Sequence, residues 1–199
     1  MDANGGNQAQ CTDYFLYPTV DRSPHWSPDG TAIVFQSNRG NADPNDYDVY
    51  VTSDDQCSMS FPRPPLMSLA ALHPDREEDP AWSPDGTKIV YVHSTATGAG
   101  MDHQLFTMNS DGTGQALLPP PTGSPNETNP SWSPDGLRIA FSGTFPGLQV
   151  QVYVLNADGT GGLTQLTTPT NFNGSSPRSR PMAAKSFSRR RAMATSKST

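Results

Sequence analysis

Three aspartates are candidate catalytic groups because each occupies the same place in a repeated string. Asp29, Asp85 and Asp135 each lie in a W-S-P-D-G segment. One carboxylate from each copy could form a ring of ligands or supply an acid and a base. Hydrolysis by two carboxylates requires one particular pair, however, and nothing in the sequence singles out two of the three. An aspartate in such a turn can accept hydrogen bonds from nearby backbone amides, and we expect this structural role.

Other sequence patterns of catalysis and metal binding are missing. The chain has no G-x-S-x-G nucleophile motif. Its four histidines show neither an H-E-x-x-H motif nor a spacing of four residues. The two cysteines, Cys11 and Cys57, have no metal-ligand spacing; one disulfide could join them, but we favour two free thiols. The sequence therefore predicts a protein that is not an enzyme, with no metal and no cofactor.

The W-S-P-D-G string belongs to a longer repeat with two parts. The first part recurs at residues 23–35, 79–91 and 129–141, and the second part follows at 48–55, 104–114 and 151–161. The tryptophans of the three copies are Trp26, Trp82 and Trp132, so the copies are 56 and 50 residues apart. A repeat of this length indicates a fold built from stacked similar units.

Each copy has the pattern of a small antiparallel sheet. A short strand ends at the tryptophan, and Ser-Pro-Asp-Gly then forms a turn in which proline fixes one φ angle and glycine adopts a positive φ. The apolar residues that follow alternate, as expected of a β-strand. The segments D-V-Y-V and Q-V-Y-V supply a third strand, and more polar segments such as L-T-Q-L-T supply a fourth. Units of four strands that stack radially are the blades of a β-propeller.

These motifs resemble the TolB-like propeller repeat, a relative of the WD repeat in which W-S-P-D-G replaces the Trp-Asp ending. The resemblance covers residues 1–175 and predicts an all-β fold: a partial β-propeller of about three four-stranded blades. Residues 1–12 match 155–167 and would form an N-terminal strand fragment. Because TolB-like rings commonly have six blades, the resemblance implies a truncated fragment whose open faces leave it marginally stable or prone to aggregation. The structural signature consists of Trp26, Asp29, Gly30, Trp82, Asp85, Gly86, Trp132, Asp135 and Gly136, with the tryptophans packing between blades.

Residues 176–199 differ from the rest of the chain. They contain seven basic and no acidic residues, and too few apolar residues to pack, so we expect a disordered tail. The spacing of the first three copies predicts a fourth copy of the repeat in this region. The codons of Met182-Ala183 and of Met193-Ala194, read one nucleotide earlier, can encode the Asp-Gly of that repeat. We therefore infer a frameshift near Ser176; the alternative is a genuine arginine-rich tail that binds nucleic acid or an anionic membrane.

The residues just before each inner strand vary between the copies, whereas the scaffold residues repeat. We expect these variable residues to face the central channel or its mouth, where a ligand or partner would be recognised. The alternative is a solvated rim that binds nothing. The candidate binding residues are Arg22, His25, Glu78, Asp79, Glu127 and Asn129.

Charge and hydropathy limit the choice of partner. The chain has 13 basic and 19 acidic residues, and because seven basic residues lie in the tail, residues 1–175 are strongly acidic. An acidic body is unsuited to binding nucleic acid. No apolar run approaches the roughly 20 residues of a membrane-spanning helix, and residues 1–11 lack the layout of a signal peptide. We expect neither nucleic-acid binding nor direct membrane insertion, and a periplasmic or extracellular location only if a full-length parent carries a signal peptide.

Two functions follow from the resemblance. The first is a non-catalytic binding or scaffolding module that mediates protein–protein interaction. The alternative is the propeller accessory domain of a prolyl-oligopeptidase-type serine peptidase, whose catalytic domain is absent from this chain. A fragment with no function of its own is the third reading.

Overall fold

The computed structural model describes residues 12, 19–41, 43–53, 67–68, 75–97, 100–118, 126–145 and 148–168. All of them belong to one compact unit, Met1–Pro169; the second unit, Thr170–Thr199, lies outside the described residues. The described ranges contain twelve β-strands and no helix, which confirms the predicted all-β class. Consistently, no helix in these ranges is long and apolar enough to cross a membrane.

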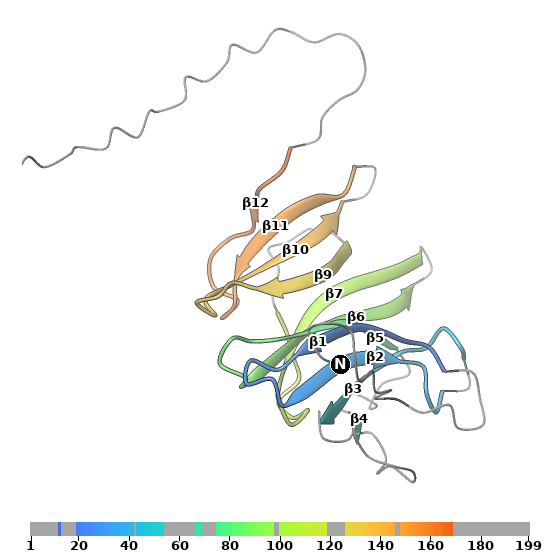
Figure 1. The fold of residues 1–199 in the computed structure, drawn as a ribbon. Coiled ribbons are helices and arrows are strands. Elements are labelled where there is room, and N and C mark those ends of the chain that lie inside the picture. Colours follow the sequence, from blue (N-terminus) through green and yellow to red (C-terminus); the bar gives the residue numbers. More distant parts are fainter. Residues whose placement is uncertain are drawn as a thin grey trace, which may run out of the picture. The chain divides into compact units, whose positions relative to one another are not determined.

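The strands form three antiparallel sheets of four strands, each in simple sequence order (Figure 1). The first sheet contains β1 (Asp21–Trp26), β2 (Ala32–Ser37), β3 (Asp48–Ser53) and β4 (Met67–Ser68). The second contains β5 (Arg76–Trp82), β6 (Lys88–Thr97), β7 (Gly100–Asn109) and β8 (Ala116–Leu117). The third contains β9 (Asn126–Trp132), β10 (Arg138–Thr144), β11 (Gln151–Asn156) and β12 (Thr164–Gln165).

This arrangement confirms the prediction of three four-stranded units. The proposed N-terminal strand fragment lies outside the described residues apart from Thr12, and so do the tail and both cysteines. The strand fragment, the frameshift near Ser176 and the domain boundary at residue 175 therefore stay predictions.

The W-S-P-D-G turn joins the first two strands of every sheet. In the first sheet, the Gly30 amide donates to the Ser27 carbonyl at 2.9 Å, and the Ser27 amide donates to the Ala32 carbonyl at 2.8 Å. Gly30 has a φ of 72°, a left-handed conformation that glycine adopts without steric cost. Gly86 and Gly136 repeat this geometry with φ angles of 71° and 70°. The repeated string is thus a repeated hairpin.

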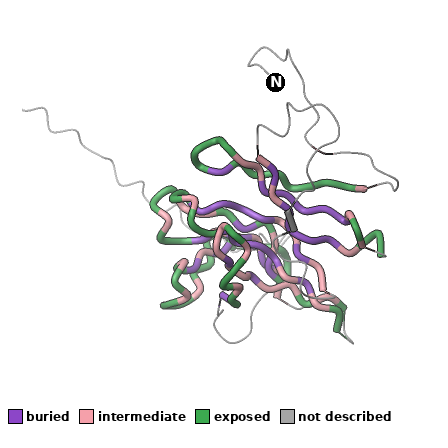
Figure 2. The backbone as a smooth tube through the Cα atoms, turned by 90° about the horizontal axis from the view of Figure 1, so that it is seen from below, coloured by how far each residue is buried: buried purple, intermediate pink, exposed green. Residues whose placement is uncertain are grey.

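The hydrophobic core lies between the sheets. Val34 and Val49 of the first sheet pack with Trp82, Ile89, Tyr91 and Met108 of the second. Val90, Val92 and Leu105 of the second sheet pack with Ile139, Phe141, Tyr153 and Leu155 of the third. Because neighbouring residues of a strand point to opposite faces, the second sheet contributes Ile89 to one cluster and Val90 to the other. Figure 2 shows the resulting buried stretches along the central strands of the sheets.

Candidate functional site

The three turn aspartates bond within their own hairpins. Asp29 accepts hydrogen bonds from the Ser27 hydroxyl at 2.6 Å and from the Thr31 amide at 3.1 Å. The equivalent serine hydroxyls of the other two turns donate to Asp85 at 2.6 Å and to Asp135 at 2.5 Å. In each turn the bond from the serine lowers the pKa of the aspartate below its usual value, because it stabilises the carboxylate. Each carboxylate therefore completes its own turn, and the three do not form a common site.

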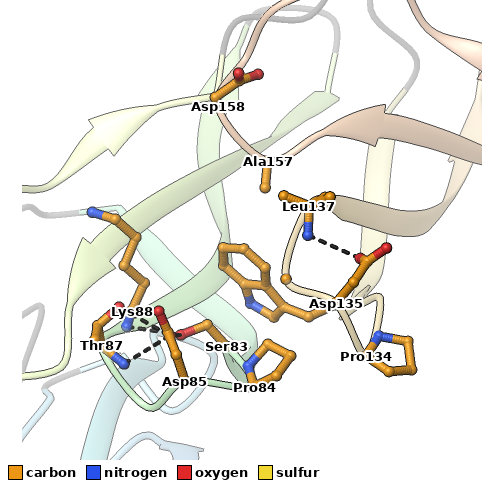
Figure 3. A pocket seen from close by; sticks show the side chains of 12 residues that line it. Ser83, Pro84, Asp85, Thr87, Lys88, Pro134, Asp135, Leu137, Ala157 and Asp158 are labelled. Carbon is orange, nitrogen blue, oxygen red and sulfur yellow. Dashed lines mark hydrogen bonds between the residues drawn. The ribbon is translucent and has the colours of Figure 1, made fainter.

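A pocket of about 640 Å³ separates two of these turns. Asp85 and Thr87 line it from the second sheet, and Asp135 and Leu137 line it from the third (Figure 3). The Leu137 amide donates to Asp135 Oδ1 at 3.0 Å, which again ties the carboxylate to its own turn. The pocket is a gap at the edge of the contact between two sheets, with Trp132 on its wall.

The innermost strands carry an unusual backbone feature. β1, β5 and β9 each have a bulge, where their pairing with the second strand shifts. At each bulge a non-glycine residue has a positive φ: Ser23 at 49°, Asp79 at 49° and Asn129 at 52°. These residues lie three positions before the repeated tryptophans. Positive φ is uncommon outside glycine, and bulges of this kind redirect side chains and are frequent beside functional sites.

The three bulge residues are joined by hydrogen bonds, and we call Ser23, Asp79 and Asn129 the inner-strand row. The Ser23 hydroxyl donates to Asp79 Oδ1 at 2.8 Å. From the other side, the Asn129 amide and its side-chain Nδ2 donate to Asp79 Oδ2 at 3.2 and 3.3 Å. The Asp79 carboxylate thus links all three sheets at an exposed surface.

The structure places the other predicted binding residues around this row with different contacts. Arg22 is exposed, and its guanidinium carbon lies 5.4 Å from the centre of the Tyr47 ring. His25 is also exposed, and its Nδ1 accepts from the Trp82 amide at 3.3 Å. Glu78 is half-buried and accepts a hydrogen bond from the Ser94 hydroxyl at 3.2 Å.

Glu127 does not belong to this surface, contrary to the expectation from sequence. Its exposed fraction is 0%, and its Oε2 accepts from the Leu105 amide of the neighbouring sheet at 2.7 Å. The reason is its position in the repeat: it lies five residues before Trp132, and the equivalent residue in the second repeat is Glu77 rather than Glu78. Burying a polar side chain is costly unless it is hydrogen-bonded, and this hydrogen bond offsets part of that cost.

Glu77 is the titratable residue that the sequence reasoning missed. It is 1% exposed, its amide donates to the Tyr47 carbonyl at 2.7 Å, and its Oε1 lies 3.3 Å from His93 Nδ1. The pKa of Glu77 is raised to about 10. Burial is the largest cause, and the hydrogen bond with the Asp48 carboxylate is the second largest. A glutamate five residues before the tryptophan in two repeats was the available signal. Within the described part of the chain, no cluster of three or more His, Cys, Asp or Glu side chains is arranged to hold a metal ion.

The sequence matches no family model, and no curated protein matches it. Solved structures do match. The putative TolB from Agrobacterium tumefaciens is 22% identical with a TM-score of 0.57, over 75% of this chain and 49% of that one. The β-propeller domain of the Trilobed protease from Pyrococcus furiosus is 11% identical with a TM-score of 0.51, over 76% of this chain and 43% of that one. The fold is that of a β-propeller.

A third match broadens the set of similar propellers. A chain of the nidogen/laminin complex is 13% identical with a TM-score of 0.54, over 75% of this chain and 48% of that one. The present chain therefore spans about half the length of the structures that it matches, or less. The predicted resemblance to TolB-like propellers is confirmed at the level of the fold, and the three sheets are from here on the first, second and third blades.

Proposed function

We propose that this chain is a non-catalytic β-propeller module that binds another protein through the inner-strand row and its surroundings. The row of three positive-φ bulges carries the proposal. At these equivalent positions the side chain changes from Ser23 to Asp79 to Asn129, whereas the tryptophan, aspartate and glycine of the turn are the same in every blade. Variable polar groups on a repeated frame are what a recognition surface requires.

The chemistry of the row favours a partner that carries hydrogen-bond donor groups. Asp79 holds a negative charge at the centre of the row, and Glu78 lies beside it in the sequence. A carboxylate has about four acceptor sites, and three of those of Asp79 are used by Ser23 and Asn129. A lysine or arginine of a partner protein could approach the remaining site, since charge-assisted hydrogen bonds are the stronger ones. The acidic character of residues 1–175 would speed the approach of a basic surface.

The accessory domain of a serine peptidase is the second candidate function. The similarity to the propeller domain of a protease supports it, at the level of the fold only. In that function the inner-strand row would face the path of a peptide substrate instead of a folded partner. The coding sequence beyond the inferred frameshift would distinguish the two functions: a G-x-S-x-G motif followed by Asp and His would favour the peptidase.

Site-specific crosslinking tests the binding function. A photoreactive amino acid at position 22, beside the row, should crosslink one discrete protein in extracts of the source organism. The same group at the exposed Gln165 of β12, far from the inner strands in the blade, is the matched control. Asp79→Asn should reduce the crosslink from position 22, because it removes the charge while asparagine tolerates the left-handed backbone. Equal crosslinking from both positions, or a crosslink unaffected by Asp79→Asn, would overturn the proposal.

A further inference from the structure

The two contacts between blades are built from the same parts. In the first contact, Trp82 of the second blade is 8% exposed and packs with Val34 and Val49 of the first. A Cβ added to Gly86 would lie 3.7 Å from Pro28 Cδ, so that this glycine faces the proline of the preceding turn. Each contact thus pairs the tryptophan and glycine of one blade with the proline and apolar face of the blade before it.

The second contact repeats this pattern. The Trp132 indole N–H donates to the Ala81 carbonyl of the second blade at 3.2 Å, and its ring packs on the apolar cluster between the two blades. A Cβ added to Gly136 would lie 3.9 Å from Pro84 Cδ. Because equivalent residues are used at both contacts between blades, they indicate which groups would take part in a further contact of this kind.

Among the described residues no blade precedes the first, and we call its Trp26 and Gly30 the leading edge. Trp26 is 52% exposed, and a Cβ added to Gly30 would have no atom within 4 Å. Other parts of the same blade are covered: Phe35 and Tyr50 are buried, and the Arg39 guanidinium lies over both rings. The open part of the first blade therefore includes the turn end that bears the leading edge, together with β1, in which all residues are exposed.

The third blade presents the opposite half of the contact, and we call Pro134, Leu137 and Val152 the receiving face. Val152 is equivalent to Val49 and Leu105, which are 0% exposed because the next blade covers them; Val152 itself is 36% exposed. Leu137 follows the turn and is 68% exposed. At the Val152 position, a side chain that is buried in the first two blades is thus open in the third.

We propose that the receiving face of this chain binds the leading edge of a second copy of the same chain. Both halves of the contact lie on one molecule, and they have the residue types that already pack against each other twice within it. Two identical contacts related by a twofold axis would give a closed two-chain species, whereas a contact that did not close would produce filaments.

Sedimentation velocity of the full chain tests this proposal. The wild-type protein, with a mass of 21.4 kDa, should sediment as a two-chain species at micromolar concentration. Trp26→Ala, in the leading edge, and Val152→Glu, in the receiving face, should each shift it to one chain. Leu117→Glu in β8 is the matched control, since Leu117 is 43% exposed but lies on neither surface, and it should leave two chains. Circular dichroism would show that the variants keep their β-structure.

Mixing the two disrupted variants gives a sharper test. A copy with Trp26→Ala keeps its receiving face, and a copy with Val152→Glu keeps its leading edge, so the mixture retains one intact contact. With one variant isotope-labelled and the other unlabelled, the mixture should therefore contain a two-chain species with one copy of each. Neither variant should form a two-chain species alone. A wild-type monomer at about 100 µM, an aggregate without a discrete two-chain species, or no mixed species would each overturn the proposal.

Discussion

Replacing Glu77 with glutamine should change how the stability of this protein depends on pH. Glu77 is buried between the first and second blades, beside Asp48 and within 3.3 Å of His93. Burial is the main cause that raises its pKa from 4.5 to about 10. In the folded protein the side chain is therefore a neutral acid at neutral pH, whereas in the unfolded chain it is ionised. Glutamine has the same shape and stays neutral at every pH.

The size of the effect follows from the proton that folding takes up. Between pH 5 and 8 the folded state holds one more proton at Glu77 than the unfolded state, so the free energy of unfolding falls by up to about 1.4 kcal/mol per pH unit. The stabilising effect of the raised pKa is complete below about pH 4.5 and is lost as the pH rises toward 10. Relative to the wild type, Glu77→Gln should thus gain stability steadily from pH 5 to pH 8.

Urea denaturation at several pH values would measure this difference, because other titrating groups are shared by the two proteins and cancel. Val92→Ala is the control: it removes buried methyl groups from the adjacent strand without altering a titratable group. It should lower the free energy of unfolding by a similar amount, on the order of 1–3 kcal/mol, at each pH. Parallel stability curves for Glu77→Gln and the wild type would refute the reasoning, since Glu77 would then titrate alike in both states.

Three further substitutions test the contacts between and within the blades. Trp82→Ala should lower the free energy of unfolding by about 3–5 kcal/mol, because it empties a buried site between two blades; a loss below about 1 kcal/mol in urea denaturation would contradict the packing described. Gly86→Ala should cost about 1–2 kcal/mol, because φ is 71° there, and thermal unfolding that is unchanged would speak against a required left-handed turn. Asp79→Ala should be less stable than Asp79→Asn, since alanine tolerates a φ of 49° poorly; equal melting temperatures would count against a strained bulge.

The blades could be predicted because their signals are local. A turn of Ser-Pro-Asp-Gly and the alternation of apolar residues act within about a dozen neighbouring residues, and three copies made the pattern unambiguous. The twelve strands and the bonds of Asp29, Asp85 and Asp135 within their own turns follow from this chemistry.

The candidate site was predicted only in part. Asp79 and Asn129 were expected near a channel mouth, and the structure brings them together with Ser23, which the sequence reasoning had not selected. Glu127 was misplaced because it was grouped with Glu78, whereas its equivalent, five residues before the tryptophan, is Glu77; neighbouring residues of a strand point to opposite faces. Which of the two faces is buried depends on the pairing and packing of the strand, and it is not visible in the composition of one strand.

By itself, the sequence determined the number of repeats, the turn chemistry and the all-β class, since each depends on residues close together in the chain. Only the tertiary structure decided which equivalent residues are buried. Trp26 and Trp82 are both followed by Ser-Pro-Asp-Gly, yet one is 52% and the other 8% exposed, because within the described ranges a preceding blade covers only the second. Burial depends on the contact between blades, and therefore the tryptophan of the same W-S-P-D-G string is exposed in the first blade and buried in the second.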